Sequence, residues 1–378
     1  MKILLVSMPS LHFFRWTEQL ENSGHDVYWF DIVDGNPTSR LPWVKKINGW
    51  KLKYPNLKGR YFIKNRLPFL KPFFERNVAI EFEKTLNEIK PDIVHSFVLY
   101  ISCTPILSIM MKYRNQKWIY SSWGSDLFYF QNKPKYLNDI KRVLPRVNYL
   151  FTDCQRDIEL AKKYGFKGEV LGVFPGGGGF DYNESDKFIK PVLERKTVLI
   201  KGYQGRSGRA IEVLKALEKI TLSLKPYKVI VFGADDEVST FIEKQNLSNT
   251  LNIECLSKHN FLPHQRILEL MGSALIYIGN SNSDGMPNTL LEAIAQGAFP
   301  IQSNPGGASE EVITHNENGL LIQDCNDSEE IKNHIQSALT NFELLEKAFK
   351  INQSKLKPNY ERSFVLSQVL KAYNSTLN

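Results

Sequence analysis

Residues 274–303 read ALIYIGNSNSDGMPNTLLEAIAQGAFPIQS. The apolar run ALIYIG predicts a buried strand, the polar, glycine-bearing turn ends it, and NTLLEAIAQG predicts a helix before the next strand, AFPIQS. Strand, helix and strand in this order are typical of a parallel sheet. Two acids flank the turn, Asp284 in the loop and Glu292 on the helix. A stretch built only for packing needs neither acid, so the turn is a candidate site.

The helix that follows the turn has an apolar and a polar face. Pro287 suits its first position, where no backbone N–H is needed. Leu290, Leu291 and Ile294 are expected in the core, while Asn288, Glu292 and Gln296 share a polar face that we expect to open on a cleft. The free N–H groups of the helix start form an anion site. The alternative is structural: Asp284 as a turn residue and Glu292 as a solvated acid.

The same alternation of strands and helices runs through the whole chain. KILLVSM, HDVYWFDI, PDIVHSF, KWIYSS and NYLFTD predict strands of a first sheet. After VFPGGGGFDYNESDKF, which reads as a linker or hinge, KTVLIKGY, YKVIVFGA, ALIYIG and AFPIQS predict a second sheet. We therefore expect an α/β protein with two Rossmann-like doubly wound domains, over residues 1–185 and 190–358, a number of domains that suits 378 residues.

Bulk composition narrows the class of protein. The formal net charge of +8 favours an anionic partner. The four cysteines have no metal-ligand spacing and read as free thiols of a reducing compartment. MKILLVSMP reads as a first strand rather than a signal peptide, and no apolar run approaches the ~20 residues that cross a bilayer. We expect a cytoplasmic protein that is at most peripheral on the inner face of the cytoplasmic membrane.

Two further loops follow predicted strands of the second domain. QGRSGRA follows KTVLIKGY, so that Lys201, Arg206 and Arg209 surround three glycines, and SNPGGASEEV follows AFPIQS. Glycines let backbone N–H groups approach a phosphate, and basic side chains neutralise it. The GK[ST] ending of a Walker loop is missing. The first strand of the chain is followed by SMPSLHFF and not by G-x-G-x-x-G, which argues against a dinucleotide dehydrogenase.

In the first domain, three ionisable residues lie at or after the ends of predicted strands. His12 comes after the first strand, His95 lies in PDIVHSF, and Asp126 lies in WGSDL. Because ligands of parallel sheets bind at the carboxyl ends of the strands, all three are candidates for ligand contact. A structural role for each is the alternative. No unambiguous nucleophile stands out.

Residues 283–322, SDGMPNTLLEAIAQGAFPIQSNPGGASEEVITHNENGLLI, resemble the donor-site signature of glycosyltransferase family 4, also called group 1. The resemblance implies the GT-B fold, with two Rossmann-like domains facing across a cleft, and transfer from a nucleotide-diphosphate sugar, by default a UDP-sugar, with retention of anomeric configuration. It implies acceptor binding by residues 1–185 and donor binding by residues 190–358. The C-terminal helix, about residues 359–378, would pack back on the first domain.

Carried over residue by residue, the resemblance implies that Glu292 binds the ribose hydroxyls and that Asp284 holds the sugar near the reacting carbon. The usual residue at the first position is glutamate, so Asp284 reaches about 1.5 Å less. Asp126 and His12 would join Asp284 in catalysis. Lys201, Arg206 or Arg209 would hold the diphosphate without a metal or other cofactor. The remaining donor-binding residues would be Gly285, Met286, Pro287, Asn288, Thr289 and Leu290.

Residues 41–76 form a basic and aromatic stretch, in which ten basic and eight aromatic residues accompany one acid, Glu75. Such a stretch suits an anionic membrane surface, where aromatic rings seat in the headgroup layer. An irregular surface excursion is the alternative, and no nucleic-acid-binding motif is present.

We expect a glycosyltransferase whose acceptor is a saccharide, either free or carried on a lipid during assembly of a bacterial surface polysaccharide. Two rival functions stay open. A nucleotide-sugar epimerase on the same fold would need the donor alone. A non-catalytic nucleotide-sugar-binding subunit is suggested by the aspartate at position 284.

Overall fold

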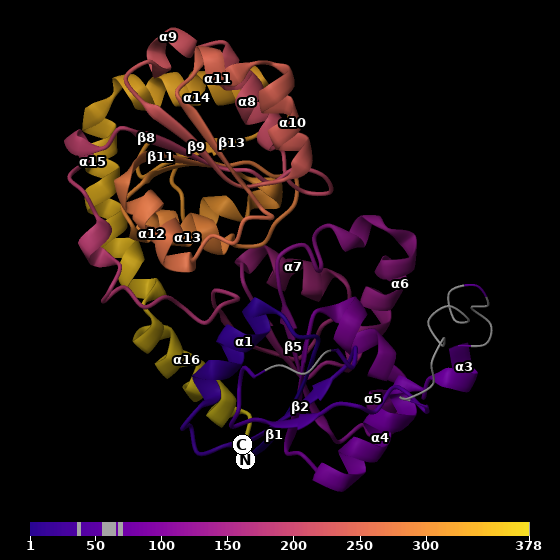
Figure 1. Cartoon of the computed structure of the whole chain (residues 1–378). Helices are drawn as coiled ribbons and strands as arrows, with labels where there is room; N and C mark the ends of the chain where they lie inside the picture. Colours follow the sequence, from indigo (N-terminus) through magenta and orange to yellow (C-terminus); the bar gives the residue numbers. More distant parts are fainter. Residues whose placement is uncertain (36–38, 55–65, 67–70, 378) are drawn as a thin grey trace. The chain divides into compact units, whose positions relative to one another are not determined.

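The structure is a computed structural model that describes residues 1–35, 39–54, 66 and 71–377. The chain forms two compact units, each built on its own β-sheet with helices on both faces (Figure 1). Unit 1 comprises residues 1–153 and 157–178 and the C-terminal segment from Leu366, and unit 2 comprises residues 154–156 and 179–365. The prediction of an α/β protein with two parallel sheets is confirmed.

Unit 1 contains a seven-stranded parallel sheet in the order β3-β2-β1-β4-β5-β6-β7. The strands are β1 Lys2–Ser7, β2 Asp26–Asp31, β3 Lys45–Ile47, β4 Ile93–Phe97, β5 Lys117–Ser122, β6 Tyr149–Thr152 and β7 Glu169–Val173. The helices are α1 Leu11–Thr17, α3 Lys71–Phe74, α4 Val78–Ile89, α5 Leu107–Lys112, α6 Pro134–Val143, α7 Gln155–Lys163 and α16 Arg362–Ser375.

Successive residues of β1 face opposite sides of this sheet. Leu4 and Val6 belong to a core of mixed aliphatic and aromatic side chains that also contains residues of α4 and α5. On the other face, aromatic rings pack edge to face: Phe13 and Trp16 of α1 contact Phe97 and Phe151 at ring-centroid distances of 5.4 and 5.2 Å. Burial on both faces explains why the strands read as continuous apolar runs.

The aromatic face also receives the C-terminal helix α16. The hydroxyl of Tyr373, a fully buried residue, lies 2.5 Å from Nδ1 of His95 and accepts a hydrogen bond from Trp16 Nε1 at 3.2 Å. Nε2 of His95 lies 2.8 Å from Ser121 Oγ. Both ring nitrogens of His95 are therefore used inside unit 1, and complete burial holds the pKa of this histidine well below its usual range. His95 therefore has the structural role that was the alternative to ligand contact.

Unit 2 contains a six-stranded parallel sheet in the order β10-β9-β8-β11-β12-β13. The strands are β8 Thr197–Lys201, β9 Lys228–Ala234, β10 Ile253–Ser257, β11 Ala274–Gly279, β12 Phe299–Ser303 and β13 Leu320–Ile322. The helices are α8 Ala210–Glu218, α9 Thr221–Leu224, α10 Asp236–Lys244, α11 Leu247–Thr250, α12 His264–Ser273, α13 Asn288–Ala295, α14 Ser328–Thr340 and α15 Phe342–Ile351.

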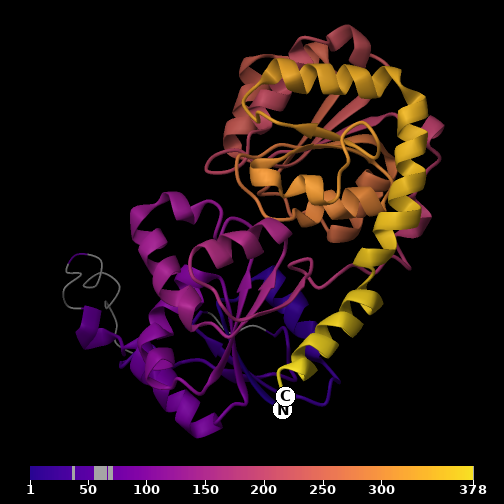
Figure 2. The same ribbon diagram turned by 180° about the vertical axis from the view of Figure 1, so that it is seen from behind.

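Two cores cover the faces of this second sheet. Helices α8, α10 and α14 pack on one face, around Val198 and Ile200 of β8. Helices α12 and α13 pack on the other face, where Leu199 of β8 points (Figures 1 and 2). The predicted core residues Leu290, Leu291 and Ile294 are all fully buried here. The face that α12 and α13 cover therefore carries the helix on which the candidate site depends.

The glycines of VFPGGGGFD mark the boundary between the units, which falls between Gly178 and Gly179. Both have positive φ, at 72° and 83°. A Cβ on Gly178 would lie 2.4 Å from the side chain of Gln19, and one on Gly179 would lie 3.0 Å from the Arg362 backbone. The glycines thus meet conformational and steric requirements and are not simply a flexible spacer.

Helix α1 ends at Thr17 and is followed by a 3₁₀ turn over Glu18–Leu20, and Gly24 takes a φ of 76° in the turn before β2. The prediction that Pro287 is the first helical residue of α13 is wrong by one residue. Pro287 caps α13 with a ψ of 120°, and the helix begins at Asn288. Within the described ranges, no helix is both long and apolar enough to span a membrane.

Candidate functional site

The candidate site lies where the strand order of unit 2 reverses direction. From β8 the chain adds β9 and β10 on one side, and it later adds β11, β12 and β13 on the other. The loops that follow β8 and β11 therefore leave the sheet side by side and continue to α8 and α13 on opposite faces. Such a switch point is where open α/β sheets bind ligands.

Backbone hydrogen bonds join these two loops. Arg209 N donates to Asn280 O at 2.9 Å, and Asn282 N donates to Ser207 O at 2.8 Å. Gly208 and Ser281 form the antiparallel bridge between them. A Cβ on Gly208 would lie 2.2 Å from the Tyr203 carbonyl oxygen, so only glycine fits at this position. The basic loop over residues 201–209 is thereby fixed beside the acidic loop over residues 280–287.

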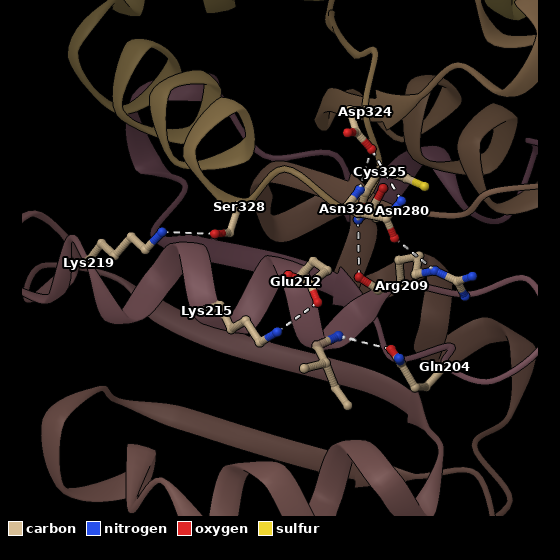
Figure 3. A network of polar contacts seen from close by, with 11 residues as sticks. Gln204, Arg209, Glu212, Lys215, Lys219, Asn280, Asp324, Cys325, Asn326 and Ser328 are labelled. Atoms are coloured by element: carbon tan, nitrogen blue, oxygen red, sulfur yellow. Dashed lines mark hydrogen bonds and ion pairs between the residues drawn. The ribbon is translucent and has the colours of Figure 1, made fainter.

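The three basic residues of the first loop have different surroundings. Arg209 donates through Nη1 to the carbonyls of Gly205 and Gly208, at 2.9 and 2.6 Å, and through Nε to Asn326 Oδ1 at 3.2 Å (Figure 3). Lys201 Nζ lies 4.9 Å from the ring centroid of Tyr203, and Arg206 is exposed. Arg209 therefore organises the loop, whereas Arg206 is an exposed residue of the same loop.

A third loop, between β13 and α14, is tied to the first two. Asn280 Nδ2 donates to the carbonyl of Cys325 at 2.8 Å and to that of Arg209 at 3.1 Å. Asn326 receives the bond from Arg209 and is held in turn by Asp324, which accepts from its backbone N–H (Figure 3). One buried asparagine at the end of β11 thus links three loops. This role of Asn280 could not be predicted from the sequence, because its hydrogen-bond partners are 45 to 71 residues away in the chain.

Asp284 lies half-buried in the turn, and its Oδ1 accepts from the N–H of Gly285 at 3.0 Å. Of the predicted donor-binding residues that follow, Gly285, Met286 and Pro287 are buried. Asn288 is half-buried, and Thr289 accepts through Oγ1 from the buried Tyr277 hydroxyl at 3.0 Å. The turn is a packed, hydrogen-bonded structure, which is the condition for holding a ligand in one geometry.

The polar face of α13 is more enclosed than expected. Glu292 is only 5 % exposed and accepts a hydrogen bond from His264 Nε2 at 2.7 Å. Gln296 is fully buried and donates to Ser185 Oγ at 2.8 Å. The alternative of a solvated Glu292 is therefore wrong, and so is the expectation that the whole face opens on a cleft, because its far end packs against residue 185.

Leu290 was predicted among the donor-binding residues. Its side chain is fully buried in the core beneath α13, and its N–H donates to the carbonyl of Pro287 at 3.0 Å. Contact of its backbone with a donor stays a prediction. Its apolar side chain serves the packing that holds the helix in place.

The loop SNPGGASEEV is closed by its own side chains. Asn304 Oδ1 accepts from the backbone N–H groups of Ser309 and Glu310, at 3.1 and 3.2 Å, and Asn304 Nδ2 donates to Glu310 at 2.9 Å. Ser309 Oγ donates to the carbonyl of Ser303 at 2.7 Å. The backbone N–H groups of residues 309 and 310 are thus already bonded within the loop.

In unit 1, His12 and Asp126 lie in different environments. His12 is exposed near the start of α1, with its ring centroid 6.0 Å from that of Trp123. Asp126 is 3 % exposed, and its Oδ2 accepts from Leu99 N at 2.7 Å and from the Tyr120 hydroxyl at 2.5 Å. Asp126 therefore ties the loops after β4 and β5 together. Action of either residue on a substrate stays a prediction.

Among the described residues, one group of three potential metal ligands lies close together, Asp153, Cys154 and Asp157. All three are buried. Asp153 accepts from Gly124 N and Asp157 accepts from Ser122 Oγ, both at 2.7 Å. These carboxylates hold the end of β5 against the start of α7, and a metal is not needed to explain their burial.

The predicted membrane-binding stretch, residues 41–76, lies partly outside the described residues, which omit 55–65 and 67–70. Four of its lysines are hydrogen-bonded within the protein. Lys45 bonds Asp26, Lys46 bonds the Arg40 carbonyl, and Lys51 and Lys53 bond the carbonyls of Val33 and Pro72. Their stems lie along the protein surface, and the membrane contact stays a prediction.

Two family models match the chain, one in each half. Residues 183–355, which include the paired loops, match glycosyl transferases group 1, and residues 2–154 match glycosyl transferase 4-like proteins. The chain belongs to the group 1 glycosyl transferases. An uncharacterized glycosyltransferase of Haemophilus influenzae is 26 % identical over 141 residues, which are 37 % of this chain. The match spans only 38 % of that relative's length.

Solved structures share the fold of this group 1 member over the full chain. Sucrose-phosphate synthase of Thermosynechococcus elongatus has a TM-score of 0.72 at 16 % identity, with 100 % of this chain and 99 % of that chain covered. HepE of Anabaena, in complex with UDP and glucose, has a TM-score of 0.68 at 12 % identity, with 99 % and 100 % covered. At these identities the likeness establishes the fold, and the predicted GT-B fold is confirmed.

The environment of Asp126 predicts a specific dependence of stability on pH. Burial, the largest effect, raises the pKa of Asp126 from 3.8 to about 7 in the folded chain. The folded state therefore keeps a proton that the unfolded state releases, and this carboxyl favours folding more as the pH falls from 7 toward 4. As the pH falls, the free energy of unfolding of wild type should rise relative to that of Asp126→Asn by at most about 1.4 kcal/mol per pH unit.

Urea unfolding of both proteins at pH 5, 6, 7 and 8 measures that difference. Because only the difference between the two proteins is used, other titrating groups such as His95 cancel. A free-energy difference that stays constant across this range would show that the carboxyl titrates alike in the folded and unfolded chains.

Proposed function

We propose that this protein transfers a sugar from a nucleotide-diphosphate sugar, with UDP as the favoured nucleotide, to an acceptor hydroxyl with retention of configuration. One observation carries the proposal: a basic loop is bonded directly beside the Asp284 loop and the start of α13. Transfer develops negative charge on the leaving diphosphate, and preorganised cations and backbone dipoles stabilise that charge. The UDP in the HepE structure supports the choice of nucleotide.

The roles of the two acids are those that the resemblance implies: Glu292 binds the ribose and Asp284 holds the sugar. Arg206 with Lys201 neutralises the diphosphate, while Arg209 keeps the loop in shape. We propose that unit 1 binds the acceptor, a saccharide of a growing bacterial surface glycan, with His12 as its exposed ionisable group. Retention is proposed from the resemblance of residues 283–322 to the donor-site signature of retaining enzymes.

The first prediction from the proposed function concerns the two acids, Glu292 and Asp284. Glu292→Gln should weaken binding of UDP or of the UDP-sugar by about 1.5–3 kcal/mol, because a charged acceptor of hydrogen bonds is replaced by a neutral one. Asp284→Asn should lower kcat more than affinity, because its contact strengthens near the transition state. Calorimetric titration and steady-state rates measure both effects.

A matched control is Glu254→Gln, since Glu254 is an exposed acid of the same unit that pairs with Lys228. Wild-type affinity and rate in both site variants would remove the assignment. A screen of nucleotide sugars by thermal shift, in which a ligand at a hundredfold excess over Kd stabilises by ~2.7 kcal/mol, identifies the donor. Conversion of the donor without any acceptor would indicate the epimerase, and binding without turnover would indicate the non-catalytic subunit.

The second prediction separates Arg206 from Arg209. Arg206→Ala should lower kcat by ~100-fold, the scale of one lost preorganised charge, and leave the melting temperature unchanged. Arg209→Ala should lower both, because three hydrogen bonds that shape the loop are lost. Equal effects of the two substitutions on stability would contradict this division.

The third prediction concerns metal ions. We propose that the basic side chains and the start of α13 take the place of a divalent ion at the diphosphate. Activity should therefore persist after dialysis against EDTA. Loss of activity in EDTA with recovery in Mg²⁺ or Mn²⁺ would overturn the proposal. In the same assay, Lys201→Ala shows how far activity falls when one positive charge of the loop is removed.

The fourth prediction concerns residues 41–76. We propose that this stretch binds anionic membranes, since basic groups near such a surface each contribute about 1 kcal/mol. The protein should sediment with phosphatidylserine vesicles but not with phosphatidylcholine vesicles. Binding should weaken as salt rises, because the Debye length is ~10 Å at 0.1 M. Equal sedimentation with both lipids, or none at low salt, would rule out the electrostatic contact.

A further inference from the structure

The carboxylate of Glu292 has an unusual setting for a charged group. The side chain is 6 % exposed, on the second turn of α13 and above the core that α12 and α13 share. A buried carboxylate is costly unless hydrogen bonds satisfy it. His264 Nε2 lies 2.7 Å from Glu292 Oε1 and supplies such a bond from a different helix, 28 residues earlier in the chain.

The position of His264 follows from how α12 begins. Pro263 has an extended backbone, with ψ at 141°, and His264 is the first helical residue after it. From there α12 runs over the same face of the sheet as α13, and Leu270 and Met271 pack in the same core as Leu290. This packing fixes the distance between the two helices. The histidine is consequently held at the start of α12, with one ring nitrogen directed at the carboxylate.

The two partners differ in their access to solvent. The side chain of His264 is 43 % exposed, whereas that of Glu292 is almost enclosed. The ring therefore covers one oxygen of the acid and forms part of the rim around it. A carboxylate held by a bond from the side has one orientation, and a ligand hydroxyl that approaches the acid meets a fixed acceptor and not a rotating one.

We propose that His264 is a positioning residue for the nucleotide ribose: it orients the Glu292 carboxylate so that the acid accepts hydrogen bonds from the ribose hydroxyls. This inference rests on the proposed function, in which Glu292 binds the donor. His264 itself acts through the acid. Its loss therefore weakens donor binding and leaves the chemical step, which takes place at the sugar, unchanged.

Three substitutions separate the hydrogen bond from the shape of the ring. The amide nitrogen of Gln reaches about as far as Nε2 of histidine, so His264→Gln can keep the hydrogen bond to Glu292. The shorter His264→Asn cannot reach Glu292, and His264→Phe keeps the ring without a donor. We expect His264→Phe and His264→Asn to raise Kd for UDP by about tenfold, with His264→Gln near wild type, as loss of a bond to a buried charge requires.

In steady-state assays, KM for the UDP-sugar should rise by a similar factor while kcat and KM for the acceptor stay constant, as for an interaction of equal strength in the ground and transition states. The matched control is His259→Phe. His259 also pairs with a carboxylate, Asp236, at 2.8 Å, but both side chains are about two-thirds exposed. Its substitution should leave Kd unchanged.

Double substitution identifies the route of the effect. If His264 acts through Glu292, adding His264→Phe to Glu292→Gln should raise Kd no further. Additive effects, a fall in kcat at constant KM, or wild-type Kd in His264→Phe and His264→Asn would each overturn the inference.

Failure of the proposed function has a separate signature. In that case wild type binds none of UDP, ADP, GDP and their glucose conjugates, or Glu292→Gln binds as wild type does. If Glu292→Gln weakens binding and the His264 variants do not, only the role of His264 is wrong.

Discussion

The backbone pairing between the loops after β8 and β11 is the constraint on which the candidate site depends. Parallel strands place their carboxyl ends at one edge, and the reversal of strand order lets two loops leave that edge without a helix between them. Hydrogen bonds from Arg209 to Asn280 and from Asn282 to Ser207 then fix their register. The basic loop that contains Ser207 and the loop that contains Asn282 and Asp284 are thereby held together, although they are distant in the sequence.

The side chains around this pairing divide into those that build the loops and those that face outward. The side chains of Arg209 and Asn280 donate hydrogen bonds to neighbouring backbone carbonyls. They are as polar as the residues proposed to bind the sugar nucleotide. Arg206 lies three residues away and is exposed. The division has a physical basis, because burying a polar group is costly unless hydrogen bonds within the protein compensate it, whereas an exposed side chain stays accessible to a ligand.

Unit 1 shows the same use of polar residues for construction. The sequence placed both His95 and Asp126 at strand ends, where ligands bind in this class of fold, but His95 lies in the middle of β4. Yet His95 is completely buried between Tyr373 and Ser121, and Asp126 joins the Leu99 backbone to Tyr120. Tyr373 belongs to the last helix, α16, so the histidine also secures the C-terminal segment to the sheet. The position of a residue at a strand end therefore indicates a function only weakly unless the burial of its side chain is also known.

The amino-acid sequence by itself determined the fold class and the place of the site. Apolar runs of strand length, the spacing of Leu290, Leu291 and Ile294, and the glycines beside Arg206 and Arg209 are local signals, and local backbone preferences and burial decide them. The donor-site signature identified the family. These features agree with the two parallel sheets and with the loops at the ends of β8 and β11.

Only the tertiary structure decided which polar groups pair with one another. Glu292 meets His264 because two helices share one core, Gln296 meets Ser185, and Arg209 meets Asn326 across 117 residues. The helical period placed Glu292 and Gln296 on one face but could not show what covers that face. Hydrogen bonds are short and directional, so the partner depends on how distant elements pack, and no spacing within a single segment carries that information.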